Sequence, residues 1–292
     1  MSGKFQYKFG WLPDYPDMRD YTEGHEKILP LLSRLRINGE EALPSNVDLR
    51  KWCSPVENQG DIGSCTAHAV AGVVEYFENK SFGKHLDASR LFLYKVTRNL
   101  LHFKGDTGAF LKSALGALVL FGMPPEEYWP YETERFDDEP DAFCYAFAQN
   151  YQCISYFRHD PSNVSPEEVL KSVKKYLAAG IPSVFGFTVY QSVRHADADG
   201  CIPFPSRGEK ILGGHAVAAV GYDDGKEISN PADGKTVHGA LLIRNSWGVE
   251  WGEQGYGWLP YEYVLQGLAL DWWSVLKQEW VDAGIFTKEE NS

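Results

Sequence analysis

The residues best suited to covalent chemistry lie in three short motifs that are far apart in the sequence. These are QGDIGSC at residues 59–65, GGHA at residues 213–216 and NSWG at residues 245–248. Together they supply a thiol, an imidazole and two side-chain amides. A cysteine nucleophile needs a base to take its proton, a group that orients the base, and donors that stabilise an oxyanion. The three motifs therefore predict acyl transfer through a cysteine nucleophile.

Cys65 is the candidate nucleophile. The apolar spacing after Ser64 predicts a helix whose buried face holds Ala67, Val70, Ala71, Val74 and Phe77. The thiol then lies in the first helical turn, where unpaired N–H groups and the helix dipole favour a thiolate. Gly63 has no Cβ and leaves room for a substrate backbone to approach. A cysteine taken alone is more often a small buried hydrophobe, but the Gln-Gly-x-x-Gly-Ser sequence before it favours catalysis.

Gln59 is the candidate oxyanion donor. It precedes the thiol by six residues, so its side-chain N–H and the backbone N–H of Cys65 can meet at one point in space. A tetrahedral intermediate would place its oxygen there, and removing one such donor raises the barrier by roughly 2.7–4 kcal/mol. The alternative is a glutamine that only satisfies a turn.

Eight histidines compete for the role of base. His215 follows two glycines and opens the apolar run AVAAVGY, which is typical of a buried strand whose first residue can face a cleft. His68 lies one turn after the thiol on the same predicted helix, so its side chain points along the helix. His195 and His238 lie in polar loops, where we expect them to be solvated. We therefore predict His215 as the general base.

Asn245 is the candidate that orients the base. It follows a predicted strand at residues 240–244, and its side-chain oxygen can accept the second imidazole proton and fix the tautomer. Trp247 lies two residues further on, where its ring can cover that hydrogen bond and keep water away. The alternative is a glycine-containing turn with a buried tryptophan.

The elements that would position these motifs change character along the chain. Besides the helix after Ser64, we predict helices at residues 109–120 and from Ser165 to Gly180, where Ser-Pro-Glu-Glu supplies the cap and the glycine the end. We predict strands at residues 183–189, 215–222, 240–244 and 257–260. A mostly helical first half and a mostly β second half predict two lobes with a cleft between them.

The length and composition are those of a globular protein. The 292 residues can bury a large core, and 43% of them are hydrophobic. The net charge of −12 argues against nucleic acid or an anionic membrane as a partner. No apolar run approaches the roughly 20 residues needed to span a bilayer, and residues 1–20 do not resemble a signal peptide. These features favour a cytoplasmic location and leave export by another route open.

Five cysteines are too few for a disulfide scaffold. Buried free thiols are the default expectation, and Cys144 and Cys153 are close enough in sequence to pair. The pairing of Cys53 and Cys201 stays open. We expect no metal and no cofactor.

Both ends of the chain differ from the rest. Residues 1–45 are rich in proline, aspartate, glycine and aromatic residues, and only residues 28–37 suit a short helix. Two prolines keep residues 11–21 extended. This N-terminal segment is either a tail packed on the surface or a strap lying across the cleft. Residues 277–292 form a charged C-terminal tail.

The motifs together resemble those of the papain family of cysteine peptidases. The matching blocks are QGDIGSC, GGHAV, NSWG and WGEQGYG, in that order. The N-terminal GWLPDYPDMRDY and the YWPY at residues 128–131 are most similar to bacterial members with short propeptides. The resemblance covers roughly residues 45–276.

This resemblance implies an α+β, papain-like fold with a helical left lobe, a β-barrel-like right lobe and the active site in the cleft between them. The lobes would span residues 46–155 and 156–276. It implies peptide hydrolysis through a thioester acyl-enzyme, with the catalytic residues Cys65, His215, Asn245 and Gln59. It also implies substrate-binding roles for Gly63, Gly108, Ala216 and Trp247. Papain relatives read an apolar or aromatic side chain two residues before the cut, and residues 216 and 268–270 fit such a pocket.

The chain departs from the family pattern around the nucleophile and between the base and the amide. Ile62 replaces a cysteine, so a family disulfide is missing, and Thr66 replaces the tryptophan after the nucleophile. The gap from His215 to Asn245 is long, and its excess falls in residues 223–239. We expect these residues to form a surface hairpin beside the active site.

The N-terminal segment takes the place of a propeptide. The mature chains of the family begin about 25 residues before the nucleophile, which corresponds to Glu41 here. We expect residues 1–40 to lie in or over the cleft and to restrain activity.

An endopeptidase is the main prediction, and two alternatives stay open. The first is an exopeptidase, transpeptidase or ligase, in which residues 223–239 or 1–45 block one end of the cleft. The second is a catalytically silent binding protein. The expected partners are peptide or protein substrates and the chain's own N-terminal segment as an inhibitor. We expect a monomer that binds neither nucleic acid nor membranes.

Overall fold

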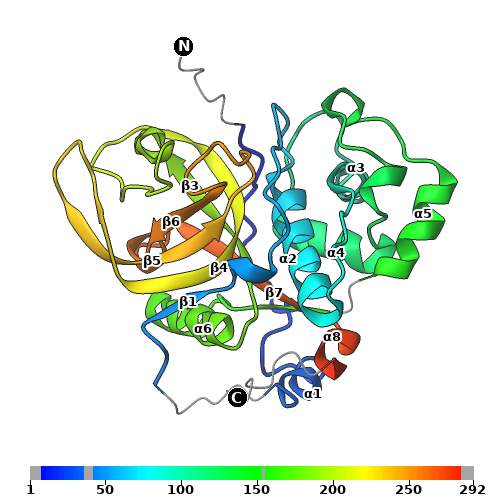
Figure 1. The fold of residues 1–292 in the computed structure, drawn as a ribbon, viewed down its shortest axis with the longest axis horizontal. Coiled ribbons are helices and arrows are strands. Elements are labelled where there is room, and N and C mark those ends of the chain that lie inside the picture. The colour runs from blue at the N-terminus through cyan, green and yellow to red at the C-terminus, as the bar shows by residue number, and fades with distance from the viewer. Residues whose placement is uncertain (1–7, 36–41, 153–154, 284–292) are drawn as a thin grey trace.

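The expected change from helix to strand along the chain is present in the computed structural model, which describes residues 8–35, 42–152 and 155–283. The helices are α1 (Leu29–Leu32), α2 (Cys65–Phe82), α3 (Arg90–Leu100), α4 (Leu111–Phe121), α5 (Ala142–Ala148), α6 (Pro166–Ala178), α7 (Glu262–Leu265) and α8 (Gln278–Asp282). The strands are β1 (Asn46–Asp48), β2 (Ser155–Arg158), β3 (Ser183–Tyr190), β4 (Ile211–Ser229), β5 (Thr236–Arg244), β6 (Tyr256–Pro260) and β7 (Ala269–Leu276). Figure 1 shows α2 to α5 on one side, the helical lobe, and most of the sheet on the other, the sheet lobe. The predicted α+β class is confirmed.

β4 is the central strand of the sheet lobe. The strands follow the order β2-β7-β3-β4-β5-β6, and β1 pairs with β4. All the pairings are antiparallel, and the sheet is open, so the expected barrel-like lobe does not close into a barrel. His215 of β4 lies opposite Phe187 of β3. Arg244 ends β5 opposite Ala218 of β4, so the next residue, Asn245, emerges at the His215 end of the sheet.

The predicted surface hairpin forms, but not beside the active site. Residues 223–239 extend β4 and β5 into a ribbon whose outermost pair is Ser229 and Thr236. His215 and Asn245 belong to the opposite end of the same two strands. The hairpin therefore points away from the candidate catalytic residues, because the added residues lengthen the strands at their far end.

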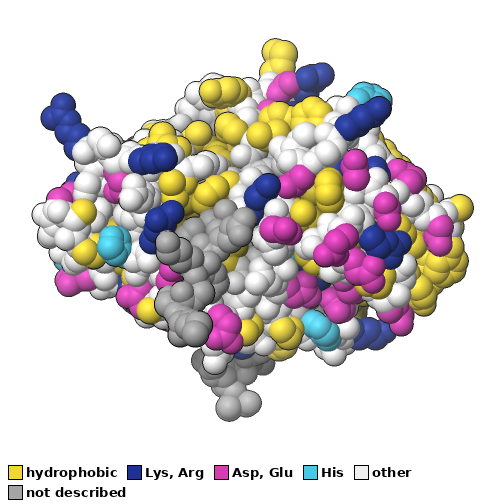
Figure 2. All heavy atoms as spheres, turned by 90° about the horizontal axis from the view of Figure 1, so that it is seen from above, with side chains coloured by type: hydrophobic (Ala, Val, Ile, Leu, Met, Phe, Trp, Pro, Cys, Tyr) yellow, Lys and Arg dark blue, Asp and Glu magenta, His cyan; other side chains and the backbone are white. Residues whose placement is uncertain are grey.

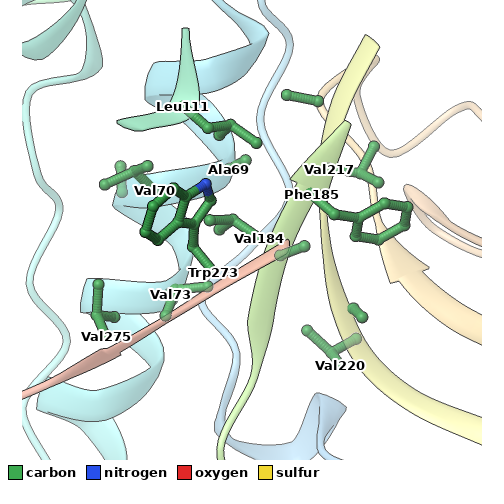
Figure 3. Packing of buried hydrophobic residues seen from close by; sticks show 14 of the residues in the cluster. Ala69, Val70, Val73, Leu111, Val184, Phe185, Val217, Val220, Trp273 and Val275 are labelled. Atoms are coloured by element: carbon green, nitrogen blue, oxygen red, sulfur yellow. The ribbon is translucent and has the colours of Figure 1, made fainter. Parts of the chain in front are cut away.

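Helix α2 forms the centre of the molecule. Every residue from Cys65 to Phe77 is buried, which is typical of a helix that packs against neighbours on several sides. It contacts β4 and β3 of the sheet and α3 and α4 of the helical lobe. Figure 3 shows its side chains beside Trp273 of β7, with Leu111 of α4 near by. The first residue of this helix is the candidate nucleophile, so the core fixes its position.

The local sequence signals locate several elements correctly. Helix α6 begins with the predicted capping box, in which Ser165 and Glu168 each bond the other's backbone N–H. Helix α4 and strands β3 to β6 also lie where they were predicted, with shifted ends. The elements that were not predicted are helices α3, α5, α7 and α8 and strands β1, β2 and β7. Nearly all residues of β7 are buried, so it lacks the alternation of polar and apolar residues that identifies a strand.

The first and last helices of the described residues pack onto the core. Of the predicted helix at residues 28–37, only α1 forms within the described residues, where Ile28, Leu31 and Leu35 are buried. The predicted charged tail begins with α8, whose Trp280 is buried and stacks on Phe77 at 4.5 Å between ring centroids. The rest of that tail, residues 284–292, lies outside the described residues.

Two further findings concern cysteines and membranes. Cys144 is a free thiol, and Cys153, its possible partner, lies outside the described residues. Cys53, Cys65 and Cys201 are free as well. In the part of the chain that the structure describes, no helix has the length and apolar character to cross a bilayer.

Candidate active site

Cys65 opens helix α2, with its side chain fully buried. Backbone groups of Ala216, Gly10 and Thr66 hydrogen-bond to the thiol and favour its thiolate form. Burial outweighs them and raises the pKa of the thiol to about 11. The contact with Ala216 brings the thiol next to His215, since these two residues are neighbours on β4.

His215 and Asn245 form a closely bonded pair at the end of the sheet. The His215 Nε2 lies 2.7 Å from the Asn245 Oδ1, so the amide oxygen can accept the Nε2 proton. Nδ1 is buried and has no hydrogen-bond partner among the described residues. Burial lowers the pKa of the imidazole to about 4, and the bond to the amide offsets this only partly. Trp247 stacks on the imidazole at 4.5 Å between ring centroids, as the sequence predicted.

Gln59 is held in place from several sides. Its Nε2 donates to the carbonyl oxygen of Ile62 at 3.0 Å, and its Oε1 accepts from Ser246 Oγ at 2.6 Å. Its backbone carbonyl accepts from Tyr131 OH at 2.9 Å. The Nε2 also donates, at 3.2 Å, to the carbonyl oxygen of Lys8. The side-chain amide that was predicted to stabilise an oxyanion thus donates a hydrogen bond to a backbone carbonyl of the N-terminal segment.

Residues 8–12, which we call the strap, run between the two lobes, and Trp11 forms an isolated β-bridge with Ala109. On the helical lobe, the Gly10 carbonyl accepts from Ala109 N at 2.8 Å and Leu12 N donates to the Ala109 carbonyl at 3.0 Å. On the sheet lobe, Trp11 N donates to the Gly214 carbonyl at 3.1 Å. Figure 1 shows this part of the chain, in dark blue, between α2 and the sheet. The strap thus bonds both lobes through its main chain.

Glycines allow the strap to approach the nucleophile closely. A Cβ on Gly108 would overlap the carbonyl group of Gly10, and a Cβ on Gly10 would overlap the carbonyl group of Gly63. Gly63 is held by Asp106, which accepts its N–H at 2.7 Å. The room that the sequence predicted for a substrate backbone beside Gly63 and Gly108 is therefore filled by the strap.

Two strap side chains cover the site. Phe9 packs edge-on against the rings of His215 and Trp247, with centroid distances of 6.3 and 6.5 Å. Trp11 is 6% exposed and enters the sheet lobe. Its Nε1 donates to Asp271 Oδ2 at 3.1 Å.

The other histidines considered as bases lie in different surroundings. The Nδ1 of His68 faces the carbonyl oxygen of Ser64 at 3.2 Å, and its ring packs edge-on against Tyr131. It is buried, and both contacts hold the ring within the helical lobe. His195 and His238 are exposed, as predicted. They do not lie in loops, because His195 belongs to a short 3-10 helix at Gln191–Ala196 and His238 to β5.

Some residues of the site were not predicted from the sequence. Ser246 and Tyr131 fix Gln59, and both lie inside motifs that the sequence singles out, NSWG and YWPY. Asp106 and Asp271 stand in no such motif. Their roles depend on contacts between residues far apart in the chain, such as Trp11 with Asp271, and no local pattern reveals such contacts.

Comparison with known proteins gives one family throughout. The family model described as "Papain family cysteine protease" matches residues 43–264. A peptidase C1-like protein of Acanthamoeba polyphaga mimivirus is 30% identical over 279 residues, which cover 91% of this chain and 86% of that protein. Cathepsin K of Gallus gallus is 30% identical over 73% of this chain, which spans 58% of the length of that relative.

Solved structures give the same result. Xylellain, a cysteine protease from Xylella fastidiosa, has a TM-score of 0.71 and 33% identity, covering 91% of this chain and 95% of its own. Digestive procathepsin L 3 of Tenebrio molitor has a TM-score of 0.61 over 82% of this chain and 72% of its own, and with 20% identity it shows the fold alone. The predicted resemblance to a papain-like protease of bacterial type is confirmed by the likeness to xylellain.

Proposed function

The chain belongs to the papain family of cysteine proteases, and we propose that it is an endopeptidase whose strap lies in its own substrate groove and holds it inactive. One observation carries this proposal. The strap passes the thiol of Cys65 as an extended backbone, hydrogen-bonded to Ala109 on one lobe and to Gly214 on the other. A site that binds a backbone in this way suits peptides and proteins in extended form.

The proposed reaction proceeds through a thioester. His215 takes the thiol proton, and the Cys65 sulfur attacks the carbonyl carbon of the peptide bond. The C–N bond breaks as the imidazolium gives its proton to the leaving amine, and the acyl group stays on sulfur. Water, deprotonated by His215, then attacks the thioester and releases the carboxylic acid, and the proton returns to sulfur. Asn245 keeps the imidazole in the required tautomer through their 2.7 Å contact.

Gln59 would stabilise the oxyanion. Its Nε2 bonds a strap carbonyl oxygen, and the geometry supports the same role toward the oxygen of a tetrahedral intermediate. The first N–H groups of α2 have no partner within the helix, and the backbone N–H of Cys65 is one of them. These donors are fixed before the reaction begins, and fixed donors are the most effective ones in catalysis.

The strap would restrain the enzyme in two ways. It fills the place of the substrate, since the oxyanion donor and the main-chain groups of both lobes are already bonded to it. It also excludes water from the thiol and the imidazole, and burial shifts both pKa values toward the neutral forms. A neutral thiol is a poor nucleophile.

Substitution of one strap glycine tests the proposal. Gly10→Ala places a Cβ where the carbonyl of Gly63 lies and should displace the strap. The matched control is Gly24→Ala, because Gly24 is exposed and has open space around its Cα. A peptidyl epoxide should label Cys65 faster in Gly10→Ala than in the parent or the control. The cleavage of an internally labelled peptide should rise in parallel.

Each other outcome rejects a defined part of the proposal. Equal labelling of the three chains would be compatible with protease activity and would reject the proposed inhibition by the strap. Cleavage only at peptide ends would favour an exopeptidase. Labelling no faster than that of a model thiol, together with no cleavage, would favour a binding protein.

A further inference from the structure

Two neighbouring loops form the wall of the groove on the helical lobe. One loop holds Gly63, just before the thiol, and the other holds Gly108 and Ala109. The loops lie against each other, since a Cβ on Gly63 would lie 3.3 Å from the backbone nitrogen of Gly108. Ala109 bonds the strap through both its N–H and its carbonyl group. Under the proposed function, it would bond a substrate backbone in the same way.

Asp106 and Tyr94 join these two loops through hydrogen bonds. The Asp106 Oδ1 accepts from the backbone N–H of Gly63 at 2.7 Å and from the hydroxyl of Tyr94 at 2.6 Å. The same hydroxyl accepts from the backbone N–H of Gly108 at 3.1 Å. One carboxylate and one hydroxyl thus fix a main-chain group in each loop. We call Asp106 and Tyr94 the brace.

Helix α3 gives the brace a rigid base. Tyr94 lies in the middle of this helix and is fully buried. One turn further on, the buried Arg98 donates to the carbonyl oxygen of Gly105 at 2.7 Å. Its guanidinium also lies over the Tyr94 ring, 4.3 Å from the ring centroid. The loop that carries Asp106 is therefore held to α3 at more than one point.

The protonation states of the brace suit these hydrogen bonds. Burial raises the pKa of the Tyr94 hydroxyl, so this group keeps the proton that it donates. Burial also opposes the ionisation of Asp106. Hydrogen bonds from Tyr94 and Gly63 and the charge of Lys8 outweigh that effect, so the pKa of the carboxyl lies below its usual value. An ionised carboxylate can only accept, as both bonds to Oδ1 require.

Asp106 depends on its donors because the lobe around it is acidic. The helical lobe exposes six carboxylates between Glu132 and Asp141, and Figure 2 shows acidic side chains gathered on the helical side of the upper face. A further carboxylate gains nothing from neighbours of like charge. Asp106 is stabilised instead by the two hydrogen bonds to Oδ1 and by Lys8, whose Nζ lies 3.1 Å from Oδ2.

We infer that Asp106 and Tyr94 are positioning residues, which hold the helical-lobe wall of the groove so that Ala109 can pair with a peptide backbone. The inference rests on the proposed function. Ile62 stands where the family has a disulfide cysteine, so the brace holds this wall without a covalent link. Cys65 is fixed separately, since the burial of α2 determines its position. Loss of the brace should therefore weaken the binding of peptides and leave the reactivity of the thiol unchanged.

Two reagents that alkylate Cys65 test the inference in the full chain carrying Gly10→Ala, in which the strap should be displaced. A peptidyl epoxide must bind along the groove, whereas iodoacetamide is too small to need it. In Asp106→Ala and in Tyr94→Phe, the rate constant for the epoxide should fall at least about tenfold, since a hydrogen bond to a charged group is lost. The rate constant for iodoacetamide should not change. With a fluorogenic peptide, KM should rise by the same factor while kcat changes little.

Matched variants separate the brace from general damage to the fold. Asp106→Asn keeps an oxygen that can accept both bonds and should keep most of the epoxide rate. Tyr145→Phe removes another tyrosine–carboxylate bond of the helical lobe, to Glu139 at 2.5 Å, and should change neither rate. The double variant of Asp106→Ala and Tyr94→Phe should lose far less than the product of the two single losses, because the residues form one network.

Defined outcomes would overturn the inference. Equal epoxide rates in all variants would do so, and so would a parallel fall of both rates, which indicates a change at the thiol or in the whole fold. A loss in Tyr145→Phe equal to that in Tyr94→Phe would have the same meaning. If Asp106→Asn lost as much as Asp106→Ala, the bonds to Oδ1 would not be the cause. No peptide cleavage by the Gly10→Ala chain with an intact brace would instead reject the proposed function.

Discussion

At the scale of single residues, we expect the activity to depend on whether water reaches Cys65 and His215. With the strap in place, burial raises the pKa of the thiol to about 11 and lowers that of the imidazole to about 4. Both groups are therefore neutral at pH 7. The reactive thiolate–imidazolium pair needs a more polar surrounding, and displacement of the strap would provide it.

The pH dependence of thiol alkylation should report this change. In the parent chain we expect the alkylation of Cys65 by iodoacetamide to be slow at pH 7 and to rise with pH toward about 11, because only the thiolate reacts and high pH favours it. In Gly10→Ala the rise should occur at lower pH, since hydration removes the main cause of the raised pKa. Mass spectrometry of the labelled peptide gives the rate at each pH. The same midpoint in both chains would contradict this explanation.

Removal of the Gln59 amide should affect turnover and leave thiol reactivity alone. In the Gly10→Ala chain, Gln59→Ala should lower kcat/KM by roughly 10²–10³, the usual loss for one oxyanion donor. Ser246→Ala should cause a smaller loss, because it only frees the Gln59 Oε1 that Ser246 Oγ now holds at 2.6 Å. Alkylation of Cys65 by iodoacetamide is the control measurement. If alkylation falls as far as turnover, Gln59 acts on the nucleophile and not on the oxyanion.

The residues of this site differ in how far the sequence could predict them. Cys65, His215, Asn245 and Gln59 lie in short motifs, and the structure brings them together. Asp271 has no motif, because its contact is with Trp11, which is 260 positions away in the chain. Local sequence gives the type of chemistry here, and contacts between distant residues give the surroundings of the strap.

At the scale of elements, the site lies where the ends of three elements meet. Helix α2 begins at the thiol, β4 carries the imidazole near its start, and β5 ends just before the amide. The burial of α2 and the pairing of β4 with β5 fix these ends relative to one another. The sequence predicted these elements from the spacing of apolar residues and from capping residues, which are local signals. It did not predict β7, whose side chains are almost all buried and whose partners β2 and β3 lie far away in the sequence.

The cap of α6 offers a test at this scale. Ser165→Ala removes the side chain that accepts the Glu168 N–H at 3.3 Å, and should lower the free energy of unfolding by roughly 0.5–2 kcal/mol. The exposed Ser162, three residues earlier and outside the helix, is the matched control for alanine substitution. Urea denaturation followed by circular dichroism gives both values. Equal effects of the two substitutions would mean that the capping box contributes nothing measurable.

At the scale of the whole molecule, the N-terminal segment belongs to the folded core as well as to the active site. Trp11, Ile28, Leu31 and Leu35 are buried in the same hydrophobic cluster as α2 and the sheet. The side chain of Asp20 is buried and forms an ion pair of 3.0 Å with Arg158. Arg34 of this segment also pairs with Asp282 of α8 at 2.8 Å. The segment therefore connects the groove, the core and the C-terminal helix.

Truncation and local displacement of this segment should consequently have different effects. A chain that starts at Glu41 loses four buried apolar side chains, each of which contributes about 1.5–3 kcal/mol, so its free energy of unfolding should fall by at least about 5 kcal/mol. Gly10→Ala keeps three of these side chains and the Asp20 ion pair in place, and should lose far less. Guanidinium denaturation of the two chains measures the difference. If the truncated chain is as stable as Gly10→Ala, the segment is a detachable inhibitor. If it is much less stable, the protein can become active by moving the strap out of the groove but not by discarding the whole segment.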